Sequence, residues 1–143
     1  YTHLSPWHAD SAAARFCDRL IPMNALVLHG SVKLMHGLNG TTDQAAHLAA
    51  FGLAPQWEVC RRPVESFGIR TYAEAKTKLI DYYQRFYGDE GLALLTEAHR
   101  LESVHEPAEG VKRLTYDNGL TVIANESDQA YNGGAPGNFN RIN

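Results

Sequence analysis

The chain has 143 residues (15.8 kDa) and a hydrophobic content of 44%, which is enough to bury the core of one globular domain. Its 13 Lys and Arg side chains stand against 16 Asp and Glu side chains, and the formal charge of -3 gives no basic footprint for nucleic acid and no polybasic segment for a membrane surface. No apolar run approaches the roughly 20 residues needed to cross a bilayer. We therefore expect neither nucleic acid nor a membrane as a partner.

The first third of the chain is predicted to alternate helices with strands. Residues 10–20 have the spacing of a short helix that ends at Pro22. Met23–His29 is a nearly continuous apolar run, which is typical of a strand covered on both faces in a parallel sheet. Glycine and asparagine are frequent in residues 30–41, so an irregular loop is expected there.

The middle of the chain has two capping-box patterns. Thr-x-x-Gln opens a predicted helix over residues 41–51, and Thr-x-x-Glu opens a second one over residues 71–87. A short strand, Gln56–Cys60, is expected between them, and residues 90–100 resume helical spacing. The aromatic side chains of the second helix recur at helical spacing, and we assign them to packing rather than to ligand recognition.

The last part of the chain changes from helical to alternating periodicity. A strand is expected at residues 103–106, and Val111–Tyr116 with Leu120–Asn125 is predicted to form a β-hairpin. If Asn118-Gly119 is a two-residue type I′ turn, Leu114 lies opposite Ile123.

Three residues could contact a sugar. His29 ends the apolar run, and ligands of α/β proteins bind where strands end. A carboxylate such as Glu58 can bind hydroxyl groups, and the face of Trp57 can stack on a sugar ring, although alternation sends these two side chains to opposite faces. The alternatives are a hydrogen bond from His29 to a neighbouring carbonyl group and core packing of Trp57.

Other constellations give weaker signals. His3, His8 and Asp10 lie close in sequence, but there is no His-Glu-x-x-His and no Cys-x-x-Cys, so neither a metal nor a cofactor is expected. Among the 16 acidic residues no catalytic pair stands out. A hydrolase that uses His29 with an acid such as Asp10 has no supporting motif.

The order of several segments resembles the last part of a glycoside-hydrolase-like barrel. These segments are Asp18–Gly30, a loop with Asn39, Phe51–Trp57, Val104–Glu106 and Thr115–Asn125. The similar family consists of bacterial carbohydrate-active proteins, distantly similar to the α-N-acetylgalactosaminidase barrels, in which a barrel gives way to a β-rich accessory domain.

The resemblance implies an α/β fold, with the C-terminal βα units of a (β/α)8 barrel followed by antiparallel strands of an accessory domain. It implies barrel residues 1–101, a β-hairpin region at 102–127 that starts a β-sandwich-like domain, and a flexible tail at 128–143. The catalytic carboxylates would lie upstream, and a chain that opens on Tyr1 instead of Met fits the end of a longer protein.

The function predicted on this basis is that of a glycosidase fragment. His29, with Glu58 and Trp57, would contact an oligosaccharide or glycan substrate, and the chain would close the barrel together with the remainder of the parent protein. The alternative is a small non-catalytic α/β binding or interaction module that folds by itself.

Overall fold

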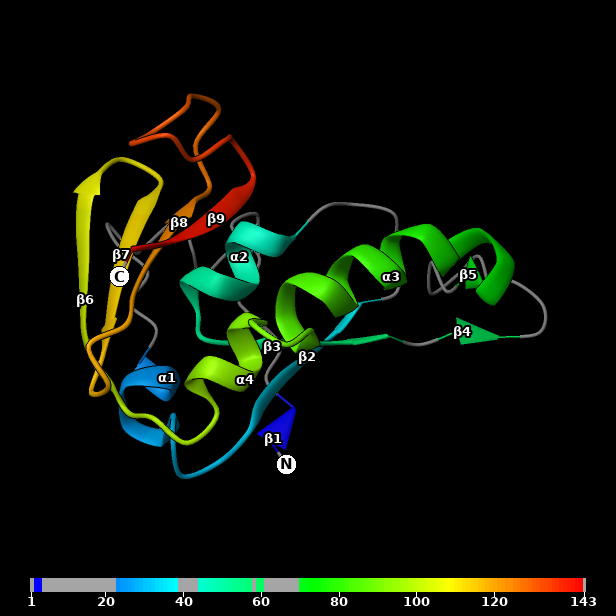
Figure 1. Cartoon of the computed structure of the whole chain (residues 1–143), viewed down its shortest axis with the longest axis horizontal. Coiled ribbons are helices and arrows are strands. Elements are labelled where there is room, and N and C mark those ends of the chain that lie inside the picture. The colour runs from blue at the N-terminus through cyan, green and yellow to red at the C-terminus, as the bar shows by residue number, and fades with distance from the viewer. Residues whose placement is uncertain (1, 4–22, 39–43, 58, 61–69, 143) are drawn as a thin grey trace, which may run out of the picture.

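A computed structural model describes residues 2–3, 23–38, 44–57, 59–60 and 70–142 of the chain (Figure 1). The helices are α1 (Met23–Leu28), α2 (Ala45–Ala50), α3 (Tyr72–Tyr87) and α4 (Leu92–Thr96). The strands are β1 (Thr2–His3), β2 (Leu34–Leu38), β3 (Ala54–Trp57), β4 (Val59–Cys60), β5 (Arg70–Thr71), β6 (Leu101–Ala108), β7 (Val111–Tyr116), β8 (Thr121–Asn125) and β9 (Asn138–Ile142).

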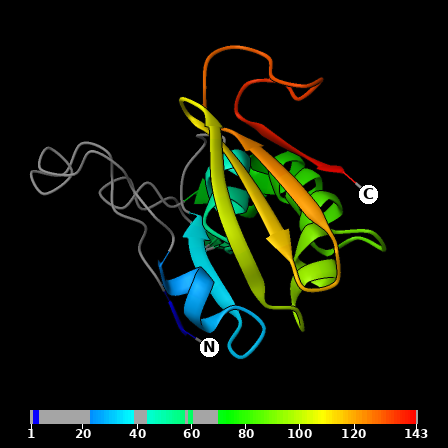
Figure 2. The same ribbon diagram turned by 90° about the vertical axis from the view of Figure 1, so that its left-hand side faces the viewer.

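The strands form three sheets. β1, β2 and β3 make a parallel sheet in that order, and β4 pairs in parallel with β5. β6, β7, β8 and β9 make an antiparallel sheet in sequence order. Figure 2 shows this antiparallel sheet in front, with α2 and α3 behind it and α1 beside it.

Helix α2 lies at the centre of the molecule. It packs against β7, β8 and β9 of the antiparallel sheet and also against β3 of the parallel sheet (Figure 1). Its buried side chains are Ala45, Ala46, Leu48, Ala49 and Ala50. Because four of these five are alanine, the helix axis can lie close to the strands, where bulkier side chains would hold it away.

The predicted barrel is wrong. Among the described residues the parallel strands form small open sheets, and the longest strands form the antiparallel sheet. In a barrel each helix covers the outside of one closed parallel sheet, whereas α2 contacts both a parallel and an antiparallel sheet. Residues on both sides of the predicted boundary at 101–102, such as Leu48 and Val122, share one hydrophobic core.

The apolar run at residues 23–29 is a helix and not the predicted strand. Ala25 is buried at 1% exposure, whereas Val27 is 69% exposed, so the element buries one side only. A short apolar run has no periodicity that separates a buried strand from a helix, and here the one-sided burial fits a helix. The strand that follows is β2, which lies in the region expected to be a loop.

Other elements agree with the sequence more closely. α3 begins at the predicted capping box, in which the Thr71 side chain accepts from the Glu74 backbone N–H and the Glu74 carboxylate accepts from the Thr71 N–H. The hairpin of β7 and β8 is also confirmed. α4 is shorter than the predicted helix at 90–100, and residues 138–142, within the predicted tail, form β9.

The register of the hairpin differs from the prediction by one residue. Leu114 pairs with Val122 rather than Ile123, and the Tyr116 N–H donates to the Leu120 carbonyl at 2.9 Å. The loop therefore has three residues and not two. Gly119 has φ +84, and glycine adopts this left-handed conformation without steric cost, as the last residue of a three-residue hairpin loop requires.

We expect Ala49→Leu to destabilise the chain by about 1–3 kcal/mol, because the added methylene groups have no space between α2 and the strands. Urea denaturation followed by circular dichroism measures the change. Ala98→Leu, at an exposed position after α4, is the matched control and should change stability by no more than about 0.5 kcal/mol. Equal effects of the two substitutions would show that α2 is not tightly packed.

Candidate functional site

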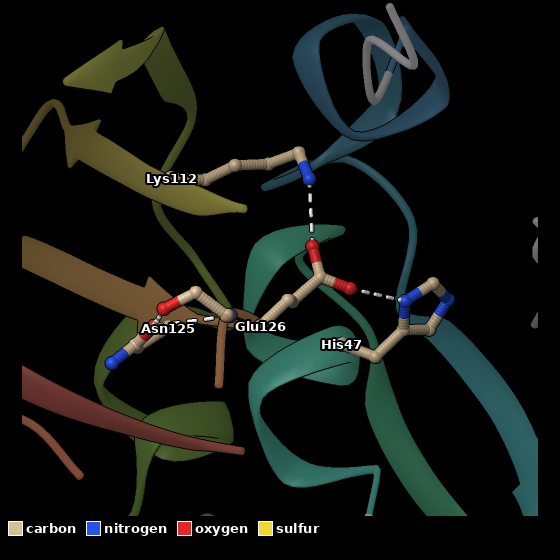
Figure 3. Close-up of polar contacts among 5 residues, drawn as sticks. His47, Lys112, Asn125 and Glu126 are labelled. Atoms are coloured by element: carbon tan, nitrogen blue, oxygen red, sulfur yellow. Dashed lines mark hydrogen bonds and ion pairs between the residues drawn. The ribbon is translucent and has the colours of Figure 1, made fainter. Parts of the chain in front are cut away.

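Three charged or ionisable side chains meet beside α2. Glu126 follows β8, His47 projects from α2 and Lys112 from β7 (Figure 3). One carboxylate oxygen of Glu126 lies 2.7 Å from His47 Nδ1, and the other accepts from Lys112 Nζ at 2.6 Å. We call His47, Lys112 and Glu126 the polar cluster.

Strand register places Lys112 in the cluster. Lys112 pairs with Ala124, and Leu114 pairs with Val122. Because Lys112 and Leu114 are two residues apart, their side chains lie on the same face of β7, and this face packs against α2. The Lys112 side chain is only 11% exposed, and its ammonium group lies 5.2 Å from the centre of the Phe51 ring. A buried ammonium group requires a carboxylate or several acceptors, and Glu126 supplies the carboxylate.

Asn125 fixes the backbone next to Glu126. Its side chain is fully buried, and Oδ1 accepts from the Ser127 N–H at 3.1 Å and from the Ser127 hydroxyl at 2.6 Å. Its Nδ2 donates to the Gln129 carbonyl at 2.7 Å. The Glu126 N–H donates to the Gly110 carbonyl at 2.7 Å, so the backbone on both sides of the Glu126 side chain is held in place.

The electrostatics of the cluster favour an ionised Glu126. Burial by itself raises the pKa of this carboxyl group, but the hydrogen bonds from His47 and Lys112 and the Lys112 charge outweigh burial and lower the pKa below its usual range. Nδ1 of His47 faces Glu126, and its ring stacks obliquely on Phe51 at 4.7 Å. The hydroxyl of Ser127 donates to Asn125, within its own loop. The contacts thus make the cluster a link between α2 and the antiparallel sheet.

His29 lies directly after α1 and is 8% exposed. Its Nδ1 bonds to the His99 carbonyl at 2.8 Å, and its ring packs edge-on against Tyr116 at 5.2 Å. Burial lowers the pKa of His29, and the bond to His99 opposes this effect. The cavity that His29 lines has a volume of about 20 Å³, which is the space of one water molecule and not of a sugar ring. Substrate binding by His29 stays a prediction, while the hydrogen bond to a carbonyl group, its stated alternative, is present.

Trp57 and Glu58 were the other predicted sugar contacts, and the described structure does not bring Trp57 together with His29. Trp57 is half-buried in β3 and packs edge-on against Tyr82 at 5.8 Å. Its indole Nε1 is buried with no hydrogen-bond partner in the described part of the chain. Glu58, like His8 and Asp10, lies outside the described residues, so its predicted role stays a prediction.

A second candidate surface lies on α3, which extends away from the antiparallel sheet in Figure 1. At about 100° per residue, six of its positions fall in one sector of about 100°. We call them the α3 face: Tyr72, Lys76, Leu79, Ile80, Tyr83 and Tyr87. The buried side chains Ala75, Tyr82 and Phe86 occupy the adjoining sector. The apolar arc of α3 is therefore wider than the part of it that the described structure covers.

Exposure confirms that much of this face is open. Tyr72 is 54%, Ile80 44% and Tyr83 58% exposed. Tyr87 is half-buried against the core, and its hydroxyl donates to the Pro55 carbonyl at 2.8 Å. Sequence reasoning assigned all of these aromatic residues to packing. The width of the apolar arc could have distinguished the exposed aromatic residues from the buried ones. A helix that packs on one side needs only the buried sector, and the α3 face widens the arc beyond it.

The surroundings of the two candidate sites give no further assignment. Within the described ranges, no group of three His, Cys, Asp or Glu residues is arranged to hold a metal ion, and no helix is long and apolar enough to span a membrane. No protein-family model, curated protein or solved structure matches the chain.

Substituting Glu126→Gln removes the carboxylate and leaves Lys112 buried without its counter-charge. We expect a loss of about 1.5–3 kcal/mol in the free energy of unfolding, measured by urea denaturation at neutral pH. Glu97→Gln is the control, because Glu97 pairs with Lys33 at 3.2 Å with side chains 46% and 27% exposed, and we expect a loss below about 1 kcal/mol. Equal losses would mean that the cluster contributes no more than a surface ion pair.

The stabilisation from Glu126 should depend on pH. Because its folded-state pKa is lowered, its contribution is complete above the ordinary glutamate pKa of about 4.3 and is lost as the pH falls through the folded-state value. The stability difference between the wild type and Glu126→Gln should therefore be constant near neutral pH and decrease towards about pH 3. A difference that stays constant over the whole range would contradict an ionised Glu126.

Proposed function

We propose that the chain is a small non-catalytic α/β interaction module that binds another protein surface through the α3 face. The observation that carries this proposal is the exposure of Tyr72, Ile80 and Tyr83 along one sector of a helix whose adjoining sector is buried. Single exposed apolar residues are ordinary on a protein surface, but an aligned group is typical of an interaction site.

The composition of the α3 face supports protein binding. Tyrosine is enriched at protein interfaces, because its ring gives a large apolar contact at a small entropic cost and its hydroxyl group can be hydrated in the free state. Lys76 is the only charged member of the face. The acidic side chains of α3 lie elsewhere, since Glu74 belongs to the capping box and Asp81 pairs with Arg85 at 3.2 Å.

The cavity beside His29 and the polar cluster both support a non-catalytic role. The described cavity beside His29 is too small for a substrate, and the groups of the polar cluster bond mainly to one another. The glycosidase interpretation stays a prediction without support from the described residues. Because the described strands do not form barrel units, the predicted role in closing a barrel is wrong.

Tyrosine acylation with N-acetylimidazole tests whether the α3 face is open in the free chain. At nanomolar protein concentration we expect Tyr72 and Tyr83 to react rapidly, while the buried Tyr82 and Tyr116 serve as internal controls that react only on unfolding. Tandem mass spectrometry identifies the modified residue. Equal protection of Tyr72, Tyr82 and Tyr83 would overturn the proposal.

Turnover tests the non-catalytic part of the proposal. The purified chain should not hydrolyse a panel of p-nitrophenyl glycosides. Release of p-nitrophenol that is lost in His29→Ala would contradict the proposal and support the glycosidase interpretation instead.

A further inference from the structure

The α3 face has the same spacing in both directions along the helix. Its members are separated by 4, 3, 1, 3 and 4 residues, as read from Tyr72 to Tyr87. The midpoint falls between Leu79 and Ile80. A face with this symmetry can be placed against a copy of itself with the two helices antiparallel, because each position then meets its mirror position in the other helix.

We propose that the partner of the α3 face is a second copy of this chain, bound antiparallel about a two-fold axis that passes between Leu79 and Ile80. This inference rests on the proposed function and names the occupant of the same surface. In this arrangement Leu79 and Ile80 meet at the centre, and Tyr72 lies opposite Tyr87 of the partner subunit. The contact is isologous, so every interaction away from the axis occurs twice.

The charges of the face fit this pairing. Lys76 lies opposite Tyr83 of the partner subunit, and an ammonium group over a tyrosine ring is attracted by the π electrons when it lies within about 6 Å of the centre of the ring. The chain already contains two contacts between an ammonium group and an aromatic ring, with Lys33 5.3 Å from the Tyr87 ring and Lys112 5.2 Å from the Phe51 ring. The mirror position of Lys76 is thus an aromatic residue and not a second cation.

The exposed residues of the face favour self-association over a partner with a different surface. An acidic partner would need cations spread along the face, but Lys76 is the only one. A polar partner would leave Tyr72, Ile80 and Tyr83 without apolar contacts. A second α3 face places apolar residues opposite each other at four of the six positions and pairs Lys76 with an aromatic ring at the other two, over a helix of 16 residues or about 24 Å.

Sedimentation equilibrium of the full chain tests the proposal. From low to several hundred micromolar protein we expect the mass to rise from 15.8 kDa towards twice this value. Tyr83→Lys places two cations opposite each other at two sites, and the dissociation constant should increase at least about tenfold. Gln84→Lys is the matched control, because it adds the same charge at an exposed neighbouring position outside the face and should change the constant less than about twofold.

A charge-pair rescue tests the register. In the double variant Lys76→Glu with Tyr83→Lys, each glutamate lies opposite a lysine of the other copy, so dimerisation should return towards the wild-type constant. Circular dichroism checks that every variant is folded. A wild-type chain that stays at 15.8 kDa at all concentrations overturns the proposal, as does a Tyr83→Lys effect that the double variant does not reverse.

Tyrosine acylation separates this inference from the proposed function. Rapid labelling of Tyr83 at nanomolar protein that slows at several hundred micromolar supports the dimer. Rapid labelling at both concentrations leaves the interaction module intact and overturns the second copy as its partner. Protection at both concentrations overturns the two proposals together.

Discussion

The fold depends on the close packing of α2 between strands of two different sheets. Five of its six residues are buried, and four of these five are alanine. This small-residue helix allows β8 and β3 to approach it and to contribute to one core. Since protein interiors are packed nearly as densely as organic crystals, a helix with larger side chains at these positions would separate the sheets or strain the strands. The element with the least side-chain volume therefore sets the spacing of the core.

The polar cluster follows from the same packing. His47 is the residue of α2 that is not buried with the others, and it lies at the margin of the helix–sheet contact, where Lys112 points inward from β7. An inward lysine is costly unless its charge is balanced, and Glu126 balances it while also contacting the helix. A buried charged group of this kind adds little net stability compared with an apolar residue, but it accepts only one arrangement of its partners. We regard orientation of α2 on the sheet as the physical role of the cluster.

α3 differs from the other helices because its apolar surface exceeds what the described core can cover. Tyr82 and Phe86 face inward and stack on each other at 5.9 Å, and Phe86 also contacts Phe139 of β9 at 5.1 Å. Tyr72, Ile80 and Tyr83 face outward. One helix thus has two apolar sectors, of which the first is buried in the core and the second contacts the core through Tyr87. The second sector is where the chain can contact something else, and its symmetrical spacing points to a second copy.

The sequence by itself determined the features that depend on neighbouring residues. The Thr71–Glu74 capping box and the β7–β8 hairpin are encoded by a few adjacent side chains, because hydrogen bonds within one turn decide them. Only the tertiary structure decided that residues 23–28 form a helix and not a strand. It also decided the one-residue shift of the hairpin register and the absence of a barrel among the described strands. The polar cluster was also invisible in the sequence, since His47 and Glu126 are 79 positions apart and become neighbours only when α2 packs on the sheet. Contacts of this kind depend on long-range burial, for which a single sequence carries no local signal.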